Sequence, residues 1–181
     1  MTTPLEVLDT ATAIGSLTNA DAPTGAAEGD KFLVVNGTAF VGIAEVSSAV
    51  GSAAVTDRTS SLSLVALATS SSLESSVAVN ETAARNGSGG STNFIASGAM
   101  SWSTSVDGLL DVAGATGSAI TVMDAARAKN YMIVKFDIDE GAGNTFYAGQ
   151  VLIDSVSISG GVDDIATYSA SFTGYGDLYK G

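Results

Sequence analysis

The sequence contains neither cysteine nor histidine. Without cysteine, the chain can form no disulfide scaffold, no thiol nucleophile and no thiolate metal site. Without histidine, it lacks the side chain that most often serves as a general base or a transition-metal ligand near neutral pH. These two absences exclude Ser-His-Asp hydrolases, HExxH metalloproteases, most transition-metal enzymes and disulfide-stabilised domains.

Basic, aromatic and long apolar segments are also scarce. The chain has 7 Lys and Arg against 19 Asp and Glu, a formal net charge of -12, whereas proteins that hold nucleic acid by its phosphates need clustered Lys and Arg. Aromatic residues make up 7%, which is poor for a sugar-stacking platform. The longest nearly apolar run, residues 62–68, is too short to span a bilayer. Because the first ten residues carry acids where a signal peptide carries bases, we expect cytoplasmic synthesis and no membrane partner.

What remains is a chain of one domain's length, 181 residues, half of them Ala, Ser, Gly or Thr. Alternating or apolar-rich segments predict strands over 31–36, 38–44, 62–68, 73–79, 94–106, 131–139, 145–159 and 165–174. Helical spacing of Ile120, Met123 and Ala126 predicts one helix over 118–129. We therefore expect a mainly β fold, an antiparallel β-sandwich or open barrel with one flanking α-helix.

Two segments do not fit that pattern. Residues 1–30 are small and polar, with a Gly/Pro turn cluster, and we interpret them as an N-terminal arm or extension before a domain over 31–181. Residues 80–93 are polar and contain three glycines, with almost nothing to bury. They predict a long loop, and loops of that length inside a compact domain are usually functional.

Three motifs suggest chemistry, but each fits a plain structural role better. The glycine-rich residues 86–90 lack the following helix and Lys-Ser/Thr pair of a phosphate loop. Residues 137–141 fail the calcium-loop pattern at positions 5, 6 and 12. Asp163 and Asp164 follow two glycines and are typical of a turn. The sequence thus predicts no catalytic, cofactor or metal site.

One face of the strand over 94–106 is unusually rich in serine, with Ser97, Ser101, Ser103 and Ser105. Such a row is often only the solvated face of a sheet. A smooth, small and uncharged-to-acidic surface is also what a channel wall or a close subunit contact requires. The residues alone leave both interpretations open.

The C-terminal third resembles phage major tail tube proteins. The segments YAGQVLIDSVSIS (147–159) and VDDIATYSASFTGYGDL (162–178) are similar to the closing signature of that family, and MSWSTSVDGL (100–109) is similar to one of its strands. The likeness covers 31–178, tightly over 94–110 and 131–178. The other interpretations are a secretion-system tube or a capsid decoration protein, and a carbohydrate-binding module or glycosidase.

The resemblance implies a structural, non-enzymatic subunit of the virion tail, in which six copies form a ring and rings stack into a hollow tube. Its implied partners are further copies of itself, tape-measure and tail-terminator proteins, and DNA as passing cargo. It also implies a loop reaching the neighbouring ring, which here would hold Arg85, Asn86 and Gly87. We expect at least two of the outward acids on the half-polar strands to line the channel, because an acidic wall repels DNA; these acids are Asp107, Asp137, Asp139 and Asp154.

Overall fold

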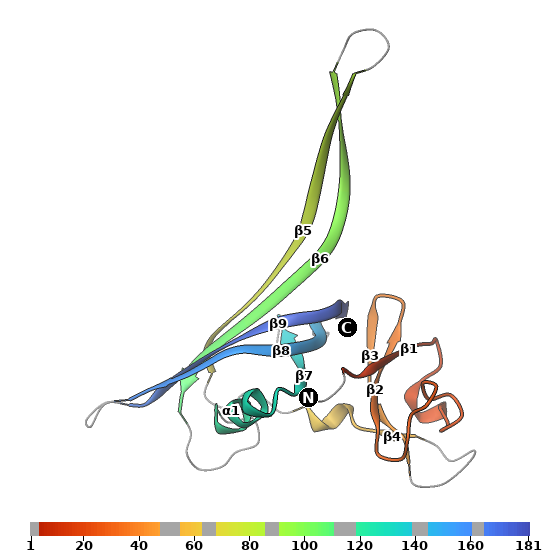
Figure 1. Ribbon diagram of the computed structural model, residues 1–181. Helices are drawn as coiled ribbons and strands as arrows, with labels where there is room; N and C mark the ends of the chain where they lie inside the picture. The colour runs from red at the N-terminus through yellow and green to blue at the C-terminus, as the bar shows by residue number, and fades with distance from the viewer. Residues whose placement is uncertain are drawn as a thin grey trace.

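The protein is described by a computed structural model for residues 4–47, 55–62, 68–85, 91–110, 119–138, 145–160 and 165–181. These residues form nine strands in one open sheet, with one α-helix beside it (Figure 1). The elements are β1 (Glu6–Asp9), β2 (Lys31–Asn36), β3 (Ala39–Glu45), β4 (Thr56–Asp57), β5 (Ala68–Arg85), β6 (Ser91–Leu109), α1 (Ala119–Ala128), β7 (Tyr131–Asp137), β8 (Phe146–Ser159) and β9 (Thr167–Lys180). The mainly β class and the single helix are as predicted.

The larger part of the sheet runs in the order β5-β6-β9-β8-β7, and every neighbouring pair in it is antiparallel. The smaller part, β1-β2-β3 with β4, joins it where Ala39 pairs with Lys180. The two parts share a core, because Leu33 and Phe40 of the smaller part cluster with Ala148 and Tyr179 of the larger one. The other face of β8 and β9 packs against α1 through Val122, so the helix covers one side of the sheet.

The hairpin of β2 and β3 turns at Asn36-Gly37, a residue pair typical of tight hairpin turns. Asn36 pairs with Ala39, and Gly37 has a φ of 59°. A residue without a Cβ adopts that left-handed conformation at little steric cost, so the local sequence accounts for the turn.

The polar segment over 80–93 is not a long loop, and this correction changes the shape of the molecule. The ladder between β5 and β6 continues through residues 80–85 and 91–93 to its last pair, Arg85 with Ser91. The result is a hairpin that projects far from the body (Figure 1). The prediction failed because it relied on apolar alternation, whereas backbone hydrogen bonds hold a strand pair together even where one strand has no apolar alternation. Residues 86–90 lie outside the described part.

Residues 4–30 also differ from the arm that we expected. Strand β1 pairs in parallel with β2, and Ile14 and Leu17 are buried beside Phe32 and Val34. The packing is therefore continuous across the expected boundary at residue 31. A few irregularly spaced apolar residues hold this segment against the sheet. Because their spacing is not periodic, the sequence did not predict this packing.

The remaining strand predictions hold with small changes. The alternation over 165–174 puts Tyr168, Ala170 and Phe172 on one apolar face, and all three are buried. The alternation over 131–139 predicts that Ile138 faces the core, but it is 58% exposed beyond the end of β7. Residues 46–57 are rich in Ser, Ala and Gly, which predicts a loop, but Thr56 and Asp57 form the two-residue strand β4. Of the strand expected over 62–68, residues 63–67 lie outside the described part.

Candidate functional site

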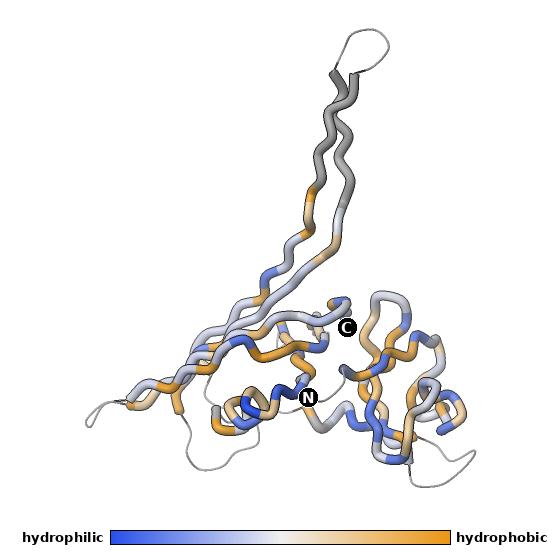
Figure 2. The backbone as a smooth tube through the Cα atoms, in the orientation of Figure 1, coloured by the Kyte–Doolittle hydropathy of each residue, from blue (hydrophilic) through white to orange (hydrophobic). Residues whose placement is uncertain are grey.

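Small hydroxyl side chains cover one face of four neighbouring strands. Along β5, β6, β9 and β8, alternate residues point to the side opposite the core, and the register places them beside one another. We call this the serine face; it comprises Ser70, Ser72, Glu74, Ser76, Ser101, Ser103, Ser105, Asp107, Thr167, Ser169, Ser171, Thr173, Ser155, Ser157 and Ser159, all exposed or half-buried. In Figure 2 these strands are largely pale, the colour of residues that are neither strongly apolar nor strongly polar.

The serine face exists because the opposite face forms a core. Trp102 and Val106 of β6 and Phe172 of β9 are buried in one cluster with Val122 of α1. Side chains alternate with a period of two along a strand, so residues 101, 103 and 105 must point away from that core. The serine-rich row seen in the sequence thus extends across four strands.

The hydroxyl groups of the serine face bond to one another across the strands. Three such pairs, Ser72–Ser105, Ser76–Ser101 and Ser155–Ser171, have Oγ–Oγ distances of 2.8, 2.9 and 2.8 Å. In each pair, the two hydroxyl groups bond to each other instead of to a group outside the protein. The face is therefore low in relief, and part of its capacity to bond a ligand is already occupied.

Two of the four acids predicted to line a channel lie on or beside this face. Asp107 accepts a hydrogen bond from Ser70 Oγ at 3.1 Å, and its backbone oxygen accepts one from Thr69 Oγ1 at 3.1 Å. Asp154 lies at a register shift of β8 and accepts a hydrogen bond from Thr173 Oγ1 at 2.9 Å. Glu74 is a third exposed acid on this face. Sequence reasoning missed it, although the strand predicted over 73–79 contains it.

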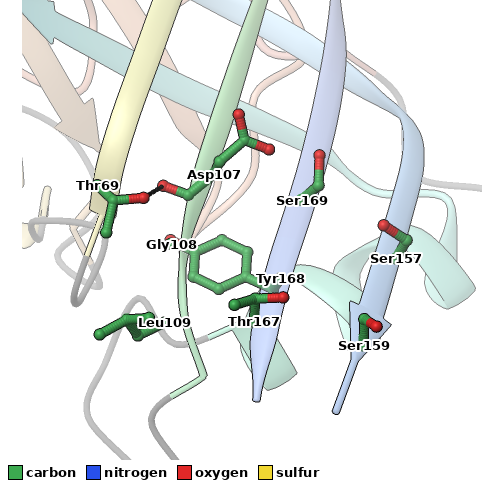
Figure 3. A pocket seen from close by; sticks show the side chains of 9 residues that line it. All are labelled: Thr69, Asp107, Gly108, Leu109, Ser157, Ser159, Thr167, Tyr168 and Ser169. Carbon is green, nitrogen blue, oxygen red and sulfur yellow. Dashed lines mark hydrogen bonds between the residues drawn. The ribbon is translucent and has the colours of Figure 1, made fainter. Parts of the chain in front are cut away.

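A shallow hollow lies at the end of the serine face where β6 and β8 end and where β5 and β9 begin. In Figure 3 the hydroxyl groups of Ser157 and Ser169 and the carboxylate of Asp107 lie along its rim. Tyr168 lies below them, and burial, with a smaller effect from the negative charge of Asp107, raises the pKa of its phenol. The hollow is lined by hydroxyls and a carboxylate, without a basic side chain.

The other predicted residues lie elsewhere. Asp137 ends β7, away from the serine face, and its carboxylate is 2.7 Å from Lys135 Nζ. Arg85 is the last residue of β5, at the far end of the hairpin. Asp139, Asn86 and Gly87, like Asp163 and Asp164, fall outside the described residues.

Both edges of the sheet that carries the serine face are open. In the described residues, β5 pairs only with β6, and β8 beyond Leu152 pairs only with β9. Open edges present unpaired backbone groups to any strand that approaches. A flat polar face between two open edges is a surface built for assembly rather than for binding a small ligand.

The model of the family described as phage tail tube protein matches residues 52–180 of this chain. The chain belongs to the phage tail tube protein family. It is a structural subunit of a tail tube and a component of the virion tail, which confirms the resemblance seen in the sequence. The matched residues include the hairpin, the helix and the whole serine face, whereas β1 to β3 precede them.

Three solved structures contain a chain that is similar to this one. A chain in the virion of a native gene transfer agent particle is 13% identical, with a TM-score of 0.54, and the match covers 66% of the tail tube protein and 88% of that chain. A chain in the tail of an empty gene transfer agent particle, refined with C6 symmetry, is 14% identical (TM-score 0.48, covering 72% and 89%). A chain of the SPP1 tail tube is 17% identical (TM-score 0.48, covering 65% and 66%). No curated protein matches the tail tube protein in sequence.

The described residues contain neither a membrane-spanning helix nor a cluster of metal ligands. Their one α-helix is too short to cross a membrane. Nowhere among them do three acidic side chains lie close enough together to hold a metal ion.

Proposed function

We propose that this tail tube protein closes into six-membered rings that stack into a hollow tube, with the serine face lining the bore through which DNA passes. The observation that carries the proposal is a contiguous, hydroxyl-rich face lying between two open sheet edges. The six-fold count follows the family resemblance.

The directions of the strands suit such a ring. Strand β5 is antiparallel to β6, β6 to β9, and β9 to β8, so β5 and β8 run in opposite directions. The β5 edge of one copy can therefore pair in an antiparallel manner with the β8 edge of the next. Closure of this kind leaves no edge exposed to unwanted pairing.

The chemistry of the serine face suits a bore for DNA. Each copy contributes Glu74, Asp107 and Asp154 near this face, and the described part of the face contains no Lys or Arg. Duplex DNA carries one negative charge per about 1.7 Å of axis, so the wall repels it. The serine pairs also leave fewer free donors for phosphate oxygens. DNA would slide along such a wall without being held.

The β5–β6 hairpin is the part of this tail tube protein that extends furthest from the body (Figure 1). We assign to it the contact with the neighbouring ring, with Arg85 at its far end and with Asn86 and Gly87, which follow Arg85 in the sequence. The tape-measure protein would occupy the bore during assembly, and a tail-terminator protein would cover the last ring. The subunits themselves would be made in the host cytoplasm.

The orientation can be tested by chemical labelling, because the chain contains no cysteine. Ser157→Cys places a thiol on the serine face, and Ala128→Cys places one on exposed α1 at the opposite side of the sheet. Both should react with a maleimide on a long polyethylene glycol in the free subunit. In assembled tubes, only Ala128→Cys should react, and microscopy should show six-fold rings. Equal labelling of both positions in tubes, or another symmetry, would contradict the proposal.

The proposal also holds that the subunit catalyses no reaction. Replacing Asp163 and Asp164 together by Asn should disturb at most a turn or assembly. A hydrolytic activity that this double variant lost, with an unchanged circular dichroism spectrum, would overturn that part of the proposal.

A further inference from the structure

Strand β6 leaves the main sheet at Trp102. Its ladder with β9 runs from Leu109 back to Ser103, whereas its ladder with β5 continues to Ser91. From residue 102 outward the hairpin is therefore a two-stranded ribbon. Ribbons of two strands are marginally stable and bend easily, so the direction of this hairpin depends on what holds its base.

Trp102, the one tryptophan of the chain, is 4% exposed at this base. Its indole lies against the backbone of β8 and β9 at Gly149 and Gly174, where a Cβ atom on either glycine would overlap the ring. The indole Nε1–H donates a hydrogen bond to the backbone oxygen of Gly176 at 3.0 Å. Gly176 has a φ of 72°, at the point where β9 shifts register against β8. We call these three glycines the Trp102 socket.

Beyond Trp102, the same side of the hairpin carries apolar residues that the body does not cover. Val77 and Met100 are directly paired and remain 49% and 44% exposed, and Val79 is exposed as well. Leu73, one step inside, still packs against the core. The contact between the hairpin and the body thus ends at Trp102. The exposed pair Val77 and Met100 adds little to that contact.

We propose that Trp102 fixes the direction in which the hairpin leaves the sheet, and that it is therefore a positioning residue for contact between copies. The indole ring of Trp102 packs on two strands and is held by one hydrogen bond. It therefore restrains both the tilt and the twist of the hairpin at its base. A smaller apolar side chain would fill part of the volume but could not make the hydrogen bond to Gly176. The link to assembly rests on the function proposed for the hairpin; the positioning itself does not.

The test measures hairpin direction in the dilute, unassembled protein. Spin labels on Val79→Cys and Ala128→Cys report the distance from hairpin to helix by double electron–electron resonance, and no other thiol interferes. We expect a narrow distribution in the parent protein and one at least twice as wide in Trp102→Leu. Trp102→Phe keeps an aromatic ring but not the hydrogen bond, and should widen it less.

The matched control is Phe172→Leu, which truncates another aromatic residue of the same core cluster. It should lower the thermal midpoint without widening the distribution. Equal widening in Phe172→Leu and Trp102→Leu, or no widening in Trp102→Leu, would overturn the proposal by reducing Trp102 to an ordinary core residue.

A second pair of variants changes a glycine and leaves Trp102 itself unchanged. Gly174→Ala should widen the distribution and shift the fluorescence of Trp102, whereas Gly15→Ala, at a glycine with no heavy atom within 4 Å of the added Cβ, should do neither. An unchanged distribution in folded Gly174→Ala would count against the socket. A widened distribution with normal tube assembly would support the positioning role and contradict the role proposed for the hairpin between copies.

Discussion

Glu45 of β3 joins three elements through its carboxylate. Arg58, which follows β4, donates hydrogen bonds to it from Nε at 3.1 Å and from Nη2 at 3.0 Å, and Lys31 Nζ of β2 lies 3.9 Å away. The hydrogen bonds from Arg58 hold the pKa of Glu45 below its usual value, against an opposing effect of burial. Because the pKa is lower in the folded state, this contribution to stability is present above the unfolded pKa and is lost as the pH falls through the folded one.

Replacing Glu45 by Gln should therefore flatten the loss of stability in acid. Urea midpoints measured between pH 7 and pH 3 should show the difference between variant and parent shrinking below the usual glutamate pKa of about 4.3. Glu74→Gln is the control, since Glu74 lies on the serine face and forms no ion pair within the described residues. A parent and a Glu45→Gln variant with parallel pH profiles would rule out this coupling.

Gln150 is a buried polar residue whose side-chain oxygen and nitrogen both form hydrogen bonds with the N-terminal segment. It is 3% exposed, its Oε1 accepts a hydrogen bond from the Leu5 amide at 2.8 Å, and its Nε2 donates one to the Leu5 carbonyl at 2.7 Å. The side chain thus imitates a neighbouring strand and holds the N-terminal segment against β8.

Gln150→Leu should loosen the N-terminal segment more than the rest of the protein. Loss of two hydrogen bonds corresponds to about 1–3 kcal/mol of stability, and the amides of residues 5–9 should exchange hydrogen faster than those of β9. Leu152→Ala, a truncation on the same strand, is the comparison. Uniform acceleration of exchange across the sheet in Gln150→Leu would refute the assignment.

At the scale of elements, the sequence predicted best where one face of a strand is buried. The alternation over 94–106 and 165–174 gave the strands and the inward residues Trp102 and Phe172 correctly, because burial imposes a period of two. Residues 80–85 and 91–93 of the hairpin have no such alternation, so the sequence did not predict that they are strands. Asp154 was counted among the outward acids, but alternation alone does not explain its position, because Val156, two residues further along the strand, is partly buried. Only the register shift between Ile153 and Ser155 brings it to the open side.

The site was predictable in part for the same reason. Serine at 101, 103 and 105 could be assigned to one face of one strand, and the acids could be counted. That four strands combine into one serine face depends on the order β5-β6-β9-β8, in which β6 (Ser91–Leu109) pairs with β9 (Thr167–Lys180), a strand far from it in the chain. Contacts such as Trp102 with Gly176 depend on that order as well.

The hairpin should be protected from protease by assembly. Arg85 is the last residue of β5 at its far end, and the chain offers only 7 Lys and Arg in all. Trypsin should cleave after Arg85 in the free subunit and much more slowly in tubes, as judged by mass spectrometry of the fragments. Lys129, exposed after α1, serves as the internal reference. Equal cleavage after Arg85 in both states would contradict a contact there.

At the scale of the whole molecule, the charge of the proposed bore is the testable quantity. Two unit charges about 10 Å apart in water repel by only about 0.4 kcal/mol, but rings of carboxylates add their fields along the tube. Asp107→Lys and Asp154→Lys should leave tubes intact and slow DNA release severalfold at low salt, whereas Asn at the same positions should have a much smaller effect.

Salt dependence separates this field from a local defect. The Debye length falls from about 30 Å at 0.01 M to about 8 Å at 0.15 M, so the delay caused by lysine should shrink over that range. Asp137→Lys, on β7 and off the serine face, is the matched control and should change release little. Release kinetics that no lysine variant alters at any salt concentration would mean that these acids do not face the DNA.

The four strands behind the serine face have a consequence for the number of copies in a ring. Each copy adds four strands, and its two edge strands run in opposite directions. Antiparallel pairing between neighbouring copies is therefore possible in a ring of five, six or seven copies. The directions of the strands therefore do not determine the number of copies in a ring, and the curvature of the sheet in each copy must determine it. Because the diameter of a barrel grows with its number of strands, we expect a change at the register shift between Ile153 and Ser155 to alter the bore diameter by whole subunits, and a change of a lining serine to leave it as it is.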